Sequence, residues 1–374
     1  MRKILVSQPI IGEEEIRMVN DALVKGEISG FSGNYIKNFE NNFAEYCNCE
    51  YGVATTSGTT ALHLALAALK IKSKDEILVQ AFTNMATFFA IHYMGAKPIP
   101  IDSDPDTLNL NPDLLESKIT PKTKAIIVVH IYGHPVDMDP VLDIAKRYGL
   151  FVVEDCAEAH GAEYKGKKVG SLGDIGCFSF YANKILTTGE GGMITTNNKK
   201  LADRARMLKS LAFGEVSKFM HQDIGYNYRL TNLQAALGVA QLKKINFIIE
   251  KKREIAAFYL KKFANFPEIQ LPVEKPYAKN VYWMFNIILR GKAKNKRNKI
   301  LAELEKYGIE TREDFIPYNM QDIFIKKGFT KKEDCPVANN IGQNGFYIPS
   351  GPVLKDTDKK YVADSLKKIL ANIP

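Results

Sequence analysis

The sequence contains no run of about 18 consecutive apolar residues, the length that a membrane-spanning helix requires. Its first residues, MRKILVSQPIIGEEEI, are interrupted by acids too early to form the apolar core of a signal peptide. The five cysteines are few, scattered and odd in number, so they do not form a disulfide framework. We therefore expect a soluble, cytoplasmic protein with reduced thiols and no membrane association.

Low-complexity segments and internal repeats are also missing, which excludes solenoid and fibrous architectures. Hydrophobic residues make up 45% of the chain and charged residues 25%, proportions typical of a globular rather than a disordered protein. With 374 residues, the chain is long enough for two domains or for one large α/β domain with an appendage.

The charge balance is basic, with 51 lysines and arginines against 42 acids and a net charge of +9. Such a balance favours anionic partners, either nucleic acid or phosphorylated metabolites. The densest basic run, residues 292–299, has no interleaved aromatic residues and leads into the apolar pattern of Ile300, Leu301 and Leu304. This arrangement is typical of a solvated helix start, so we expect no nucleic-acid binding.

Short apolar runs alternate with helix signals through the first part of the chain. Helix starts are indicated at Thr83, at Asn111 followed by Pro112, and at Asp139. The apolar runs, each bounded by turn residues, occupy residues 77–79, 98–101, 125–130, 150–154, 176–181 and 192–196. This alternation predicts an α/β fold with a parallel, doubly wound sheet.

From about residue 230 the pattern changes to longer helical segments, which are followed by an alternating strand, YWMFNIIL. No linker rich in proline, glycine or serine marks the change, so we expect the boundary to lie inside a helix. We predict a large domain over residues 15–245 and a smaller C-terminal α/β domain over residues 246–374. Residues 1–14 are expected to pack on the smaller domain.

A turn of small residues, Thr56-Ser57-Gly58-Thr59, follows the strand-like segment YGVAT and precedes a helix pattern. The backbone N–H groups of such a turn, together with the positive end of the helix dipole, can hold a phosphate group. An ordinary helix cap by Ser57 or Thr59 explains the same residues. By itself, this turn leaves both interpretations open.

Two later segments carry candidate catalytic side chains. An apolar strand ends at Glu154 and Asp155, with Glu158 nearby, and open α/β sheets bind ligands at the carboxyl ends of their strands. A divalent metal would need more ligands than the spacing identifies, so we predict no metal site. Lys184 follows another apolar strand and precedes a glycine-rich turn. A lysine can form a Schiff base with a carbonyl cofactor, and a carboxylate can hold a protonated pyridine nitrogen, which makes Lys184 and Asp155 a plausible pair.

Four segments together resemble the DegT/DnrJ/EryC1/StrS family of sugar aminotransferases: SGTTALHLAL, VVEDCAEAHGA, FSFYANKILTTGEGGMITTN and HQDIGYNYRLTNLQAALGVAQL. Their order and spacing match the family over most of the chain. The resemblance implies the fold-type I architecture of aminotransferases that use pyridoxal 5′-phosphate, with a large, mostly parallel seven-stranded sheet domain and a smaller C-terminal domain. It also implies a homodimer with shared active sites.

Carried over to this chain, the resemblance makes Lys184 the residue that binds the cofactor covalently and moves protons. It makes Asp155 the partner of the pyridine nitrogen. The other cofactor-binding positions that match the family are Gly58, Thr59 and Ser179 in the phosphate cradle, Phe82 stacking on the ring, Glu158 near the cofactor hydroxyl, where glutamine is common, and Asn227 reaching the phosphate from the partner subunit.

The expected substrate also comes from the resemblance. The form NKILTTGEGG, with IGYNYRLTN, KKREIA, YWMFNIIL and IETREDFIP, is most similar to the GDP-perosamine synthase branch, which aminates the 4-keto group of GDP-4-keto-6-deoxymannose with L-glutamate. Relatives that aminate UDP- or dTDP-linked sugars at C3 or C4 share similar motifs and stay open. A non-catalytic ligand sensor of the same fold is disfavoured, because both Lys184 and Asp155 are present. A nucleotide-sugar oxidoreductase is disfavoured, because no G-x-G-x-x-G follows an early strand.

Contacts with the nucleotide sugar are expected from side chains near these motifs. A guanidinium group can bind a pyrophosphate through two N–H groups at once, which makes Arg229 and Arg312 candidates. His160 lies close to the predicted site and is a candidate for touching the substrate. Thr187 and Tyr318 are candidates for contacting the sugar by analogy with the family alone.

Overall fold

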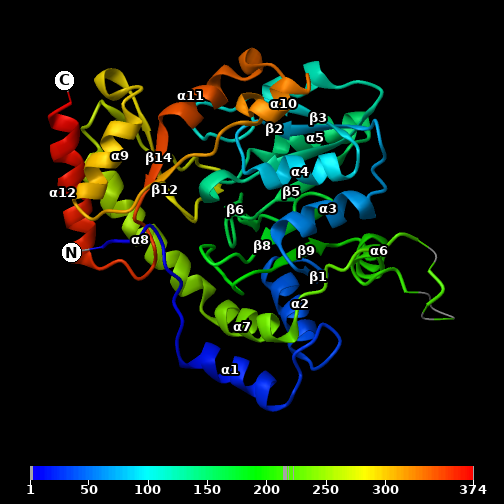
Figure 1. Ribbon diagram of the computed structural model, residues 1–374. Coiled ribbons are helices and arrows are strands. Elements are labelled where there is room, and N and C mark those ends of the chain that lie inside the picture. Colours follow the sequence, from blue (N-terminus) through cyan, green and yellow to red (C-terminus); the bar gives the residue numbers. More distant parts are fainter. Residues whose placement is uncertain (1–2, 214–216, 218, 222, 374) are drawn as a thin grey trace.

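The computed structural model describes residues 3–213, 217, 219–221 and 223–373, and its largest element is a seven-stranded sheet (Figure 1). The strands of this sheet are β1 (Tyr51–Thr55), β2 (Glu76–Gln80), β3 (Lys97–Ile101), β4 (Thr123–Val129), β5 (Phe151–Asp155), β8 (Ile175–Ser179) and β9 (Gly192–Thr196). They lie in the order β1-β9-β8-β5-β4-β2-β3. Only β9 runs antiparallel to its neighbours, so the predicted mostly parallel sheet is confirmed.

Helices cover both faces of this sheet, which is why its central strands are apolar on both sides. The side chains of Ile77 and Val79 in β2 pack in one core with helices of one face, whereas Leu78 points into the core on the other face. The helices that take part in these two cores are α3 (Gly58–Ala68), α4 (Met85–Tyr93), α5 (Met138–Tyr148) and α6 (Lys199–Lys209).

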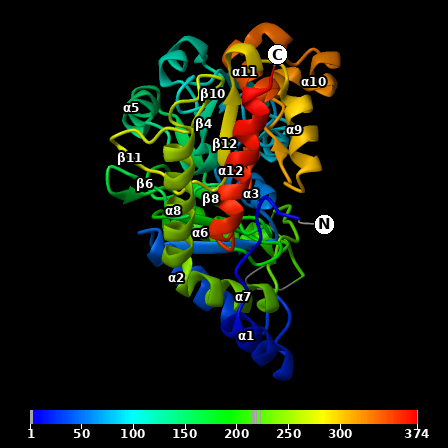
Figure 2. The same cartoon turned by 90° about the vertical axis from the view of Figure 1, so that its left-hand side faces the viewer.

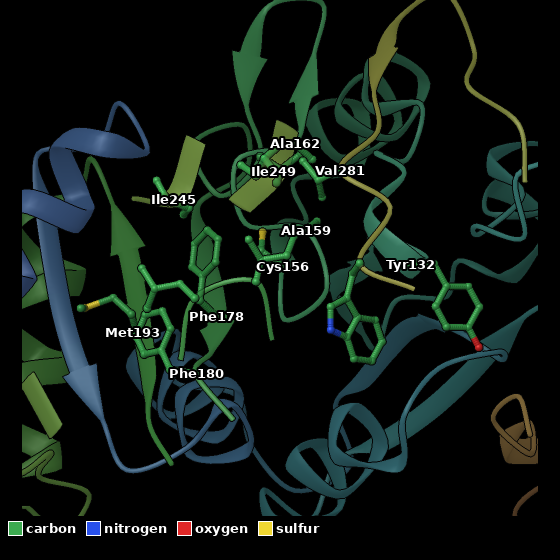
Figure 3. Close-up of a cluster of buried hydrophobic side chains, with 14 of the residues drawn as sticks. Tyr132, Cys156, Ala159, Ala162, Phe178, Phe180, Met193, Ile245, Ile249 and Val281 are labelled. Carbon is green, nitrogen blue, oxygen red and sulfur yellow. The ribbon is translucent and has the colours of Figure 1, made fainter. Parts of the chain in front are cut away.

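A third core supports the end of the sheet near β8 and β9, and Figure 3 shows part of it. It is built on α1 (Glu13–Val24), α2 (Tyr35–Tyr46) and α7 (Asn232–Lys243), which lie together at the bottom of Figure 1. The ring of Phe43 lies 4.9 Å from that of Phe178 and 5.1 Å from that of Phe180, measured between centroids. This aromatic packing anchors the strand end from which the Lys184 turn departs.

The C-terminal part of the chain forms a second sheet. Its strands, in spatial order, are β10 (Ile269–Gln270), β12 (Phe285–Leu289), β14 (Gly345–Ile348) and β13 (Arg312–Glu313). The helices α8 (Ile245–Phe263) and α12 (Asp356–Ala371) run side by side next to it in Figure 2, and α9 (Arg297–Lys306) joins them in one core. The N-terminal segment adds to this part, because the N–H of Ile4 donates to the carbonyl of Gly308 at 2.8 Å.

The C-terminal segment does not pack on the small sheet alone. The helices α10 (Asp322–Lys326) and α11 (Pro336–Asn344) return to the large sheet, where the N–H of Ala338 donates to Asp102 at 2.8 Å. A third, small sheet joins β6 (Glu163–Tyr164), β7 (Lys167–Lys168) and β11 (Ala278–Lys279). A division of the chain between residues 245 and 246, at the start of α8, remains a proposal. Within the described residues, no helix has the length and apolarity needed to cross a membrane.

Candidate active site

A cavity of about 320 Å³ lies where the large sheet meets the small one. Its floor comes from turns at the carboxyl ends of β2, β5 and β8 and from the start of α3, where an open α/β sheet is expected to bind ligands. Its other wall comes from Trp283, Phe315 and Tyr347. The predicted residues Gly58, Thr59, Asp155, Glu158, Ser179 and Lys184 all line this cavity.

The small-residue turn begins α3 and faces β8. Ser57 caps the helix, since its Oγ accepts the N–H of Thr60 at 3.2 Å. At Gly58 a Cβ atom would lie 2.7 Å from the Cβ of Ser179, so no larger residue fits without a shift. The first N–H groups of a helix have no partner within the helix. The structure therefore shows the helix cap, and it leaves N–H groups at the start of α3 beside the cavity, so phosphate binding at this turn stays a prediction.

Asp155 ends β5 and is almost completely buried, with 4% of its surface exposed. The hydroxyl of Thr87 donates to its Oδ2 at 2.8 Å, and the N–H of Ala157 donates to its Oδ1 at 3.1 Å. Burial nevertheless raises the pKa of the Asp155 carboxyl, while these two hydrogen bonds and the nearby Lys184 act in the opposite direction. A buried carboxylate in this state is suited to receive a cationic group.

Lys184 projects from the turn after β8, where its backbone N–H donates to the carbonyl of Tyr181 at 2.9 Å. Burial of its amino group lowers its pKa, and the carboxylates of Glu158 and Asp155 oppose that change. A lowered pKa increases the fraction of the neutral amine, which is the nucleophilic and basic form.

Glu158 completes the titratable group of the cavity. Its Oε2 accepts the N–H of Tyr132 at 2.8 Å, and only 3% of its surface is exposed. Burial raises the pKa of Glu158 to about 7, with Lys184 and the Tyr132 hydrogen bond acting against the shift. The cavity thus brings together one amine and two carboxyl groups whose pKa values are displaced toward neutrality, a pattern typical of catalytic sites.

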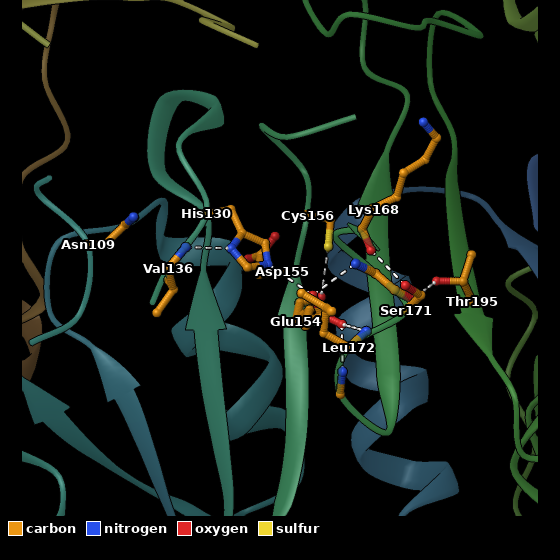
Figure 4. A network of polar contacts seen from close by, with 12 residues as sticks. Asn109, His130, Val136, Glu154, Asp155, Cys156, Lys168, Ser171, Leu172 and Thr195 are labelled. Carbon is orange, nitrogen blue, oxygen red and sulfur yellow. Dashed lines mark hydrogen bonds and ion pairs between the residues drawn. The ribbon is translucent and has the colours of Figure 1, made fainter. Parts of the chain in front are cut away.

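A polar network behind Asp155 involves His130, Glu154 and Cys156, whose ligand atoms lie within 4.8 Å of one another (Figure 4). The Nδ1 of His130 accepts the N–H of Val136 at 3.0 Å, so its Nε2 carries the proton that faces Glu154 at 3.1 Å. Glu154 also accepts backbone N–H groups, those of Gly170, Leu172 and Gly173, each at 2.8 Å. These hydrogen bonds engage the His130 nitrogens and the Glu154 oxygens, which are the atoms that would bind a metal ion. We therefore interpret the cluster as a support for the end of β5 and not as a metal site.

The structure corrects the prediction for Phe82. This ring is fully buried and does not line the cavity; it packs 5.9 Å from the ring of Phe315 and 6.2 Å from that of Tyr132. The chain turns after β2 so that Phe82 points into the core, while Thr83 and Asn84 face the cavity. Phe82 is therefore not placed to stack on a ligand there.

Three residues predicted to contact the substrate do not line this cavity, because their side chains are buried or hydrogen-bonded away from it. The His160 ring is buried near the rings of Phe178 and Phe180, at 5.4 and 5.7 Å. The hydroxyl of Thr187 donates to the carbonyl of Phe180 at 3.0 Å and closes a turn. Tyr318 is completely buried and stacks on Phe88, with the ring centroids 4.0 Å apart.

Three further predicted residues lie outside the cavity of their own subunit. Asn227 is exposed and pairs with Ser210 in an isolated bridge. The guanidinium of Arg229 lies over the ring of Phe31, with Cζ 4.8 Å from the centroid. Arg312 is exposed and forms an ion pair with Glu310 at 2.6 Å. Their roles in binding stay predictions, and for Asn227 an outward position is what a contribution to a partner subunit requires.

Sequence reasoning missed the wall that the C-terminal part contributes. Trp283, Phe315 and Tyr347 line the cavity but are about 100 to 290 residues away from the motifs of the large sheet. Asn183 and Asn84 also line the cavity, whereas the residues predicted from their segments were Lys184 and Phe82. The available signal was that Trp283 is the single tryptophan of the chain.

Comparison with known proteins agrees with this geometry. Residues 9–367 match the DegT/DnrJ/EryC1/StrS aminotransferase family. The chain is 42% identical to the GDP-perosamine synthase of Escherichia coli O157:H7 over 372 residues, covering 100% of both chains. It is 40% identical to the GDP-perosamine synthase of Caulobacter vibrioides over 342 residues, covering 90% of this chain and 91% of the relative.

Solved structures give the same result. The PLP-form structure of Spr1654 from Streptococcus pneumoniae superimposes with a TM-score of 0.94 at 27% sequence identity, covering 100% of both chains. This match covers both the large sheet and the small sheet. The chain therefore belongs to the DegT/DnrJ/EryC1/StrS aminotransferase family and is a sugar aminotransferase that depends on pyridoxal 5′-phosphate.

Proposed function

We propose that this enzyme transfers the amino group of L-glutamate to GDP-4-keto-6-deoxy-D-mannose and so forms GDP-perosamine for surface-polysaccharide synthesis. The observation that carries the choice of substrate is the 42% identity to a GDP-perosamine synthase over the whole of both chains. The cavity supports the reaction type, since an amine and two buried carboxyl groups line it.

The residues of the cavity fit pyridoxal 5′-phosphate. Gly58, Thr59 and Ser179 would hold the phosphate, because the close packing of Gly58 on Ser179 brings the start of α3 and this hydroxyl together beside the cavity. Asp155 would hold the pyridine nitrogen, because a protonated ring is a cationic partner that stabilises this buried carboxylate. When bound, the cofactor supplies an aldehyde that takes up amino groups and a ring that withdraws electrons from the reacting carbon.

Lys184 is proposed to move the proton in both halves of the reaction. L-glutamate gives up its amino group and leaves as 2-oxoglutarate, and the keto sugar then receives that amino group. Each half needs a base that removes a proton from one carbon and an acid that returns it to another position. A single amine with a lowered pKa serves both needs, because it exchanges protons near neutral pH more readily than an ordinary lysine.

We further propose a homodimer in which Asn227 serves the cavity of the partner subunit. Asn227 is exposed and does not line the cavity of its own subunit. The segment before it carries apolar side chains at the surface, with Phe219 at 78%, Met220 at 69% and Ile224 at 82% exposure. Apolar side chains exposed together are typical of surfaces that another protein covers. A second copy would bury them and bring Asn227 close to a phosphate cradle.

A panel of nucleotide-linked keto sugars tests the substrate. The purified enzyme would be assayed with L-glutamate and GDP-, UDP- or dTDP-linked keto sugars, with kcat/KM obtained from 2-oxoglutarate release. We expect GDP-4-keto-6-deoxy-D-mannose to give the highest value, and product analysis should place the amine at C4. A site that pairs the polar edge of guanine should discriminate against uracil by roughly a hundredfold or more, because unpaired buried groups are unfavourable.

Two outcomes would change the proposal. Faster turnover of a UDP- or dTDP-linked sugar would overturn the GDP assignment and leave the aminotransferase chemistry in place. Absence of 2-oxoglutarate release with every sugar, from protein that binds the cofactor, would favour a ligand sensor of the same fold.

A further inference from the structure

Tyr132 lies in the turn after β4, in the short helical segment Ile131–Gly133, with a left-handed backbone at φ +52° and ψ 15°. A residue other than glycine adopts this conformation where its surroundings impose it. In this position its N–H donates to Oε2 of Glu158 at 2.8 Å. The turn thus places a hydrogen-bond donor on a carboxyl group of the active site.

Contacts from the C-terminal part hold the turn in this shape. The carbonyl of Tyr132 accepts the N–H of Trp283 at 2.8 Å, and the carbonyl of Gly133 accepts the N–H of Val281 at 3.2 Å. The Tyr132 ring is nearly parallel to those of Trp283 and Phe315, with centroids 6.1 and 5.9 Å away. In Figure 3 the Tyr132 hydroxyl points away from the aliphatic cluster.

That hydroxyl donates to Oδ1 of Asp314 at 3.0 Å. Asp314 directly follows β13, and its Oδ2 accepts the side-chain N–H of Asn286 on β12 at 2.5 Å. A Cβ atom at Gly345 of β14 would overlap the same oxygen, so only glycine leaves room for the carboxyl group. Asp314 is therefore enclosed by three strands of the small sheet and is only 3% exposed.

We propose that Tyr132 is a positioning residue for Glu158 and that Asp314 holds Tyr132 in place. Through Tyr132, the Asp314 carboxyl beside the small sheet would then orient the Glu158 carboxyl in the turn after β5. Neither Tyr132 nor Asp314 lines the cavity, so both act through Glu158. The inference rests on the proposed function, in which Glu158 lies beside the cofactor.

The expected effect follows from the charges around the two carboxyl groups. Glu158 interacts with Lys184 and Asp155, and the N–H of Tyr132 lowers its pKa by stabilising the ionised form. The groups that interact with Asp314 include the side chains of Tyr132, Asn286, Arg297, Tyr347 and Glu158. If Tyr132 lost its anchor, the turn would relax, the hydrogen bond to Glu158 would weaken and the pKa of Glu158 would rise.

The test is a pH titration of the holoenzyme without substrate, followed through the visible absorbance of the bound cofactor. Tyr132→Phe keeps the stacked ring and removes the hydroxyl that Asp314 accepts. The matched control is Tyr259→Phe, because Tyr259 is a fully buried tyrosine whose hydroxyl donates to the carbonyl of Pro349 at 2.9 Å. Both variants lose one buried hydrogen bond, but only the first loses a contact that leads to Glu158.

We expect the apparent pKa of the absorbance change to shift by about 0.5 or more in Tyr132→Phe, because the charge on Glu158 beside the cofactor changes, and to stay at the wild-type value in Tyr259→Phe. An unshifted titration in Tyr132→Phe would overturn the inference. An equal shift in both variants would also overturn it, because the cause would then be general loosening.

Asp314→Ala provides a second, independent variant. It should shift the titration in the same direction, and the double variant with Tyr132→Phe should shift no further than the larger single effect, since both remove the same contact. Additive shifts would mean that Asp314 does not act through Tyr132. Absence of both a cofactor band and glutamate turnover in the wild-type protein would instead overturn the proposed function.

Discussion

The amino group of Lys184 lies over the face of Trp283, with Nζ 3.7 Å from the centroid of the indole. The same indole donates its Nε1–H to the carbonyl of Asn183 at 2.9 Å, so the residue that precedes the lysine fixes the ring. An aromatic face attracts a cation and therefore favours the protonated amine, against the burial that lowers its pKa. We therefore expect the single tryptophan to raise the proton affinity of Lys184.

Replacing Trp283 with leucine should lower kcat by about tenfold, because the amine loses its aromatic face and the Asn183 carbonyl loses the indole N–H that holds the turn before Lys184. The alkaline limb of the kcat–pH profile should shift to lower pH, because the pKa of Lys184 falls when the aromatic face no longer stabilises its protonated form. Steady-state kinetics between pH 6 and pH 10 would check both effects. An unchanged pH profile would contradict a role of the ring in setting the pKa of Lys184.

Lys184→Ala should reduce 2-oxoglutarate release by about a thousandfold or more, because no other described amine lines the cavity. The fold should persist, since the side chain projects into the cavity and not into the core. Thermal unfolding and circular dichroism would establish that persistence. Lys199→Ala removes an exposed lysine of α6 and serves as the control that should keep full activity.

Asp155→Asn should slow turnover severely while preserving side-chain volume, because the neutral amide cannot keep a pyridine nitrogen protonated. Thr87→Val should have a smaller effect in the same direction, since it removes one of the two hydrogen bonds that stabilise the ionised carboxyl. The comparison of kcat for the two variants checks this order. A wild-type rate for Asp155→Asn would show that another group tunes the cofactor.

Mixed dimers should reveal whether the active site is shared. Lys184→Ala and Asn227→Asp homodimers should each be weak, the second because it places an anion beside a phosphate. If Asn227 serves the partner subunit, a mixed dimer combines both defects in one site and leaves the other intact, so random mixing should restore about a quarter of wild-type activity. No recovery after verified subunit exchange would place Asn227 in its own subunit's site.

The pH dependence of stability should carry the signature of Asp314. Burial raises its pKa from 3.8 to about 8, so the folded protein binds this proton more tightly than the unfolded chain. Its contribution to stability is therefore fully present below about pH 4 and is lost as the pH rises toward 8. Asp314→Asn should flatten this decline by several kcal/mol in urea unfolding, since a tenfold difference in proton affinity corresponds to about 1.4 kcal/mol.

A surface change provides the control for that measurement. Asp113 is exposed in the short helical turn Pro112–Leu114, and Asp113→Asn should leave the slope of stability against pH unchanged. An identical slope in the wild-type protein and in Asp314→Asn would show that the buried carboxyl does not titrate over this range.

The sequence by itself determined the parts of the site that depend on local structure. The strand-turn-helix pattern around Gly58, the strand end at Asp155 and the turn that carries Lys184 are each contained in a short segment, and their apolar periodicity and turn residues could be recognised there. Parallel strands bring such carboxyl-terminal turns to one edge of a sheet. For this reason the motifs indicated a common site before any long-range contact was known.

Only the tertiary structure decided how that site is closed and which neighbouring side chains face it. Phe82, Thr187 and Tyr318 lie in or near motif segments, but packing and hydrogen bonding turn them inward, and no local pattern reports the direction of a side chain in an irregular turn. Trp283 and Asp314 act on the site through hydrogen bonds between residues 100 and 182 positions apart in the chain. The packing of the whole molecule selects such contacts. Many pairs of distant segments have compatible local structure, and only close packing in the assembled core favours one pair over the others.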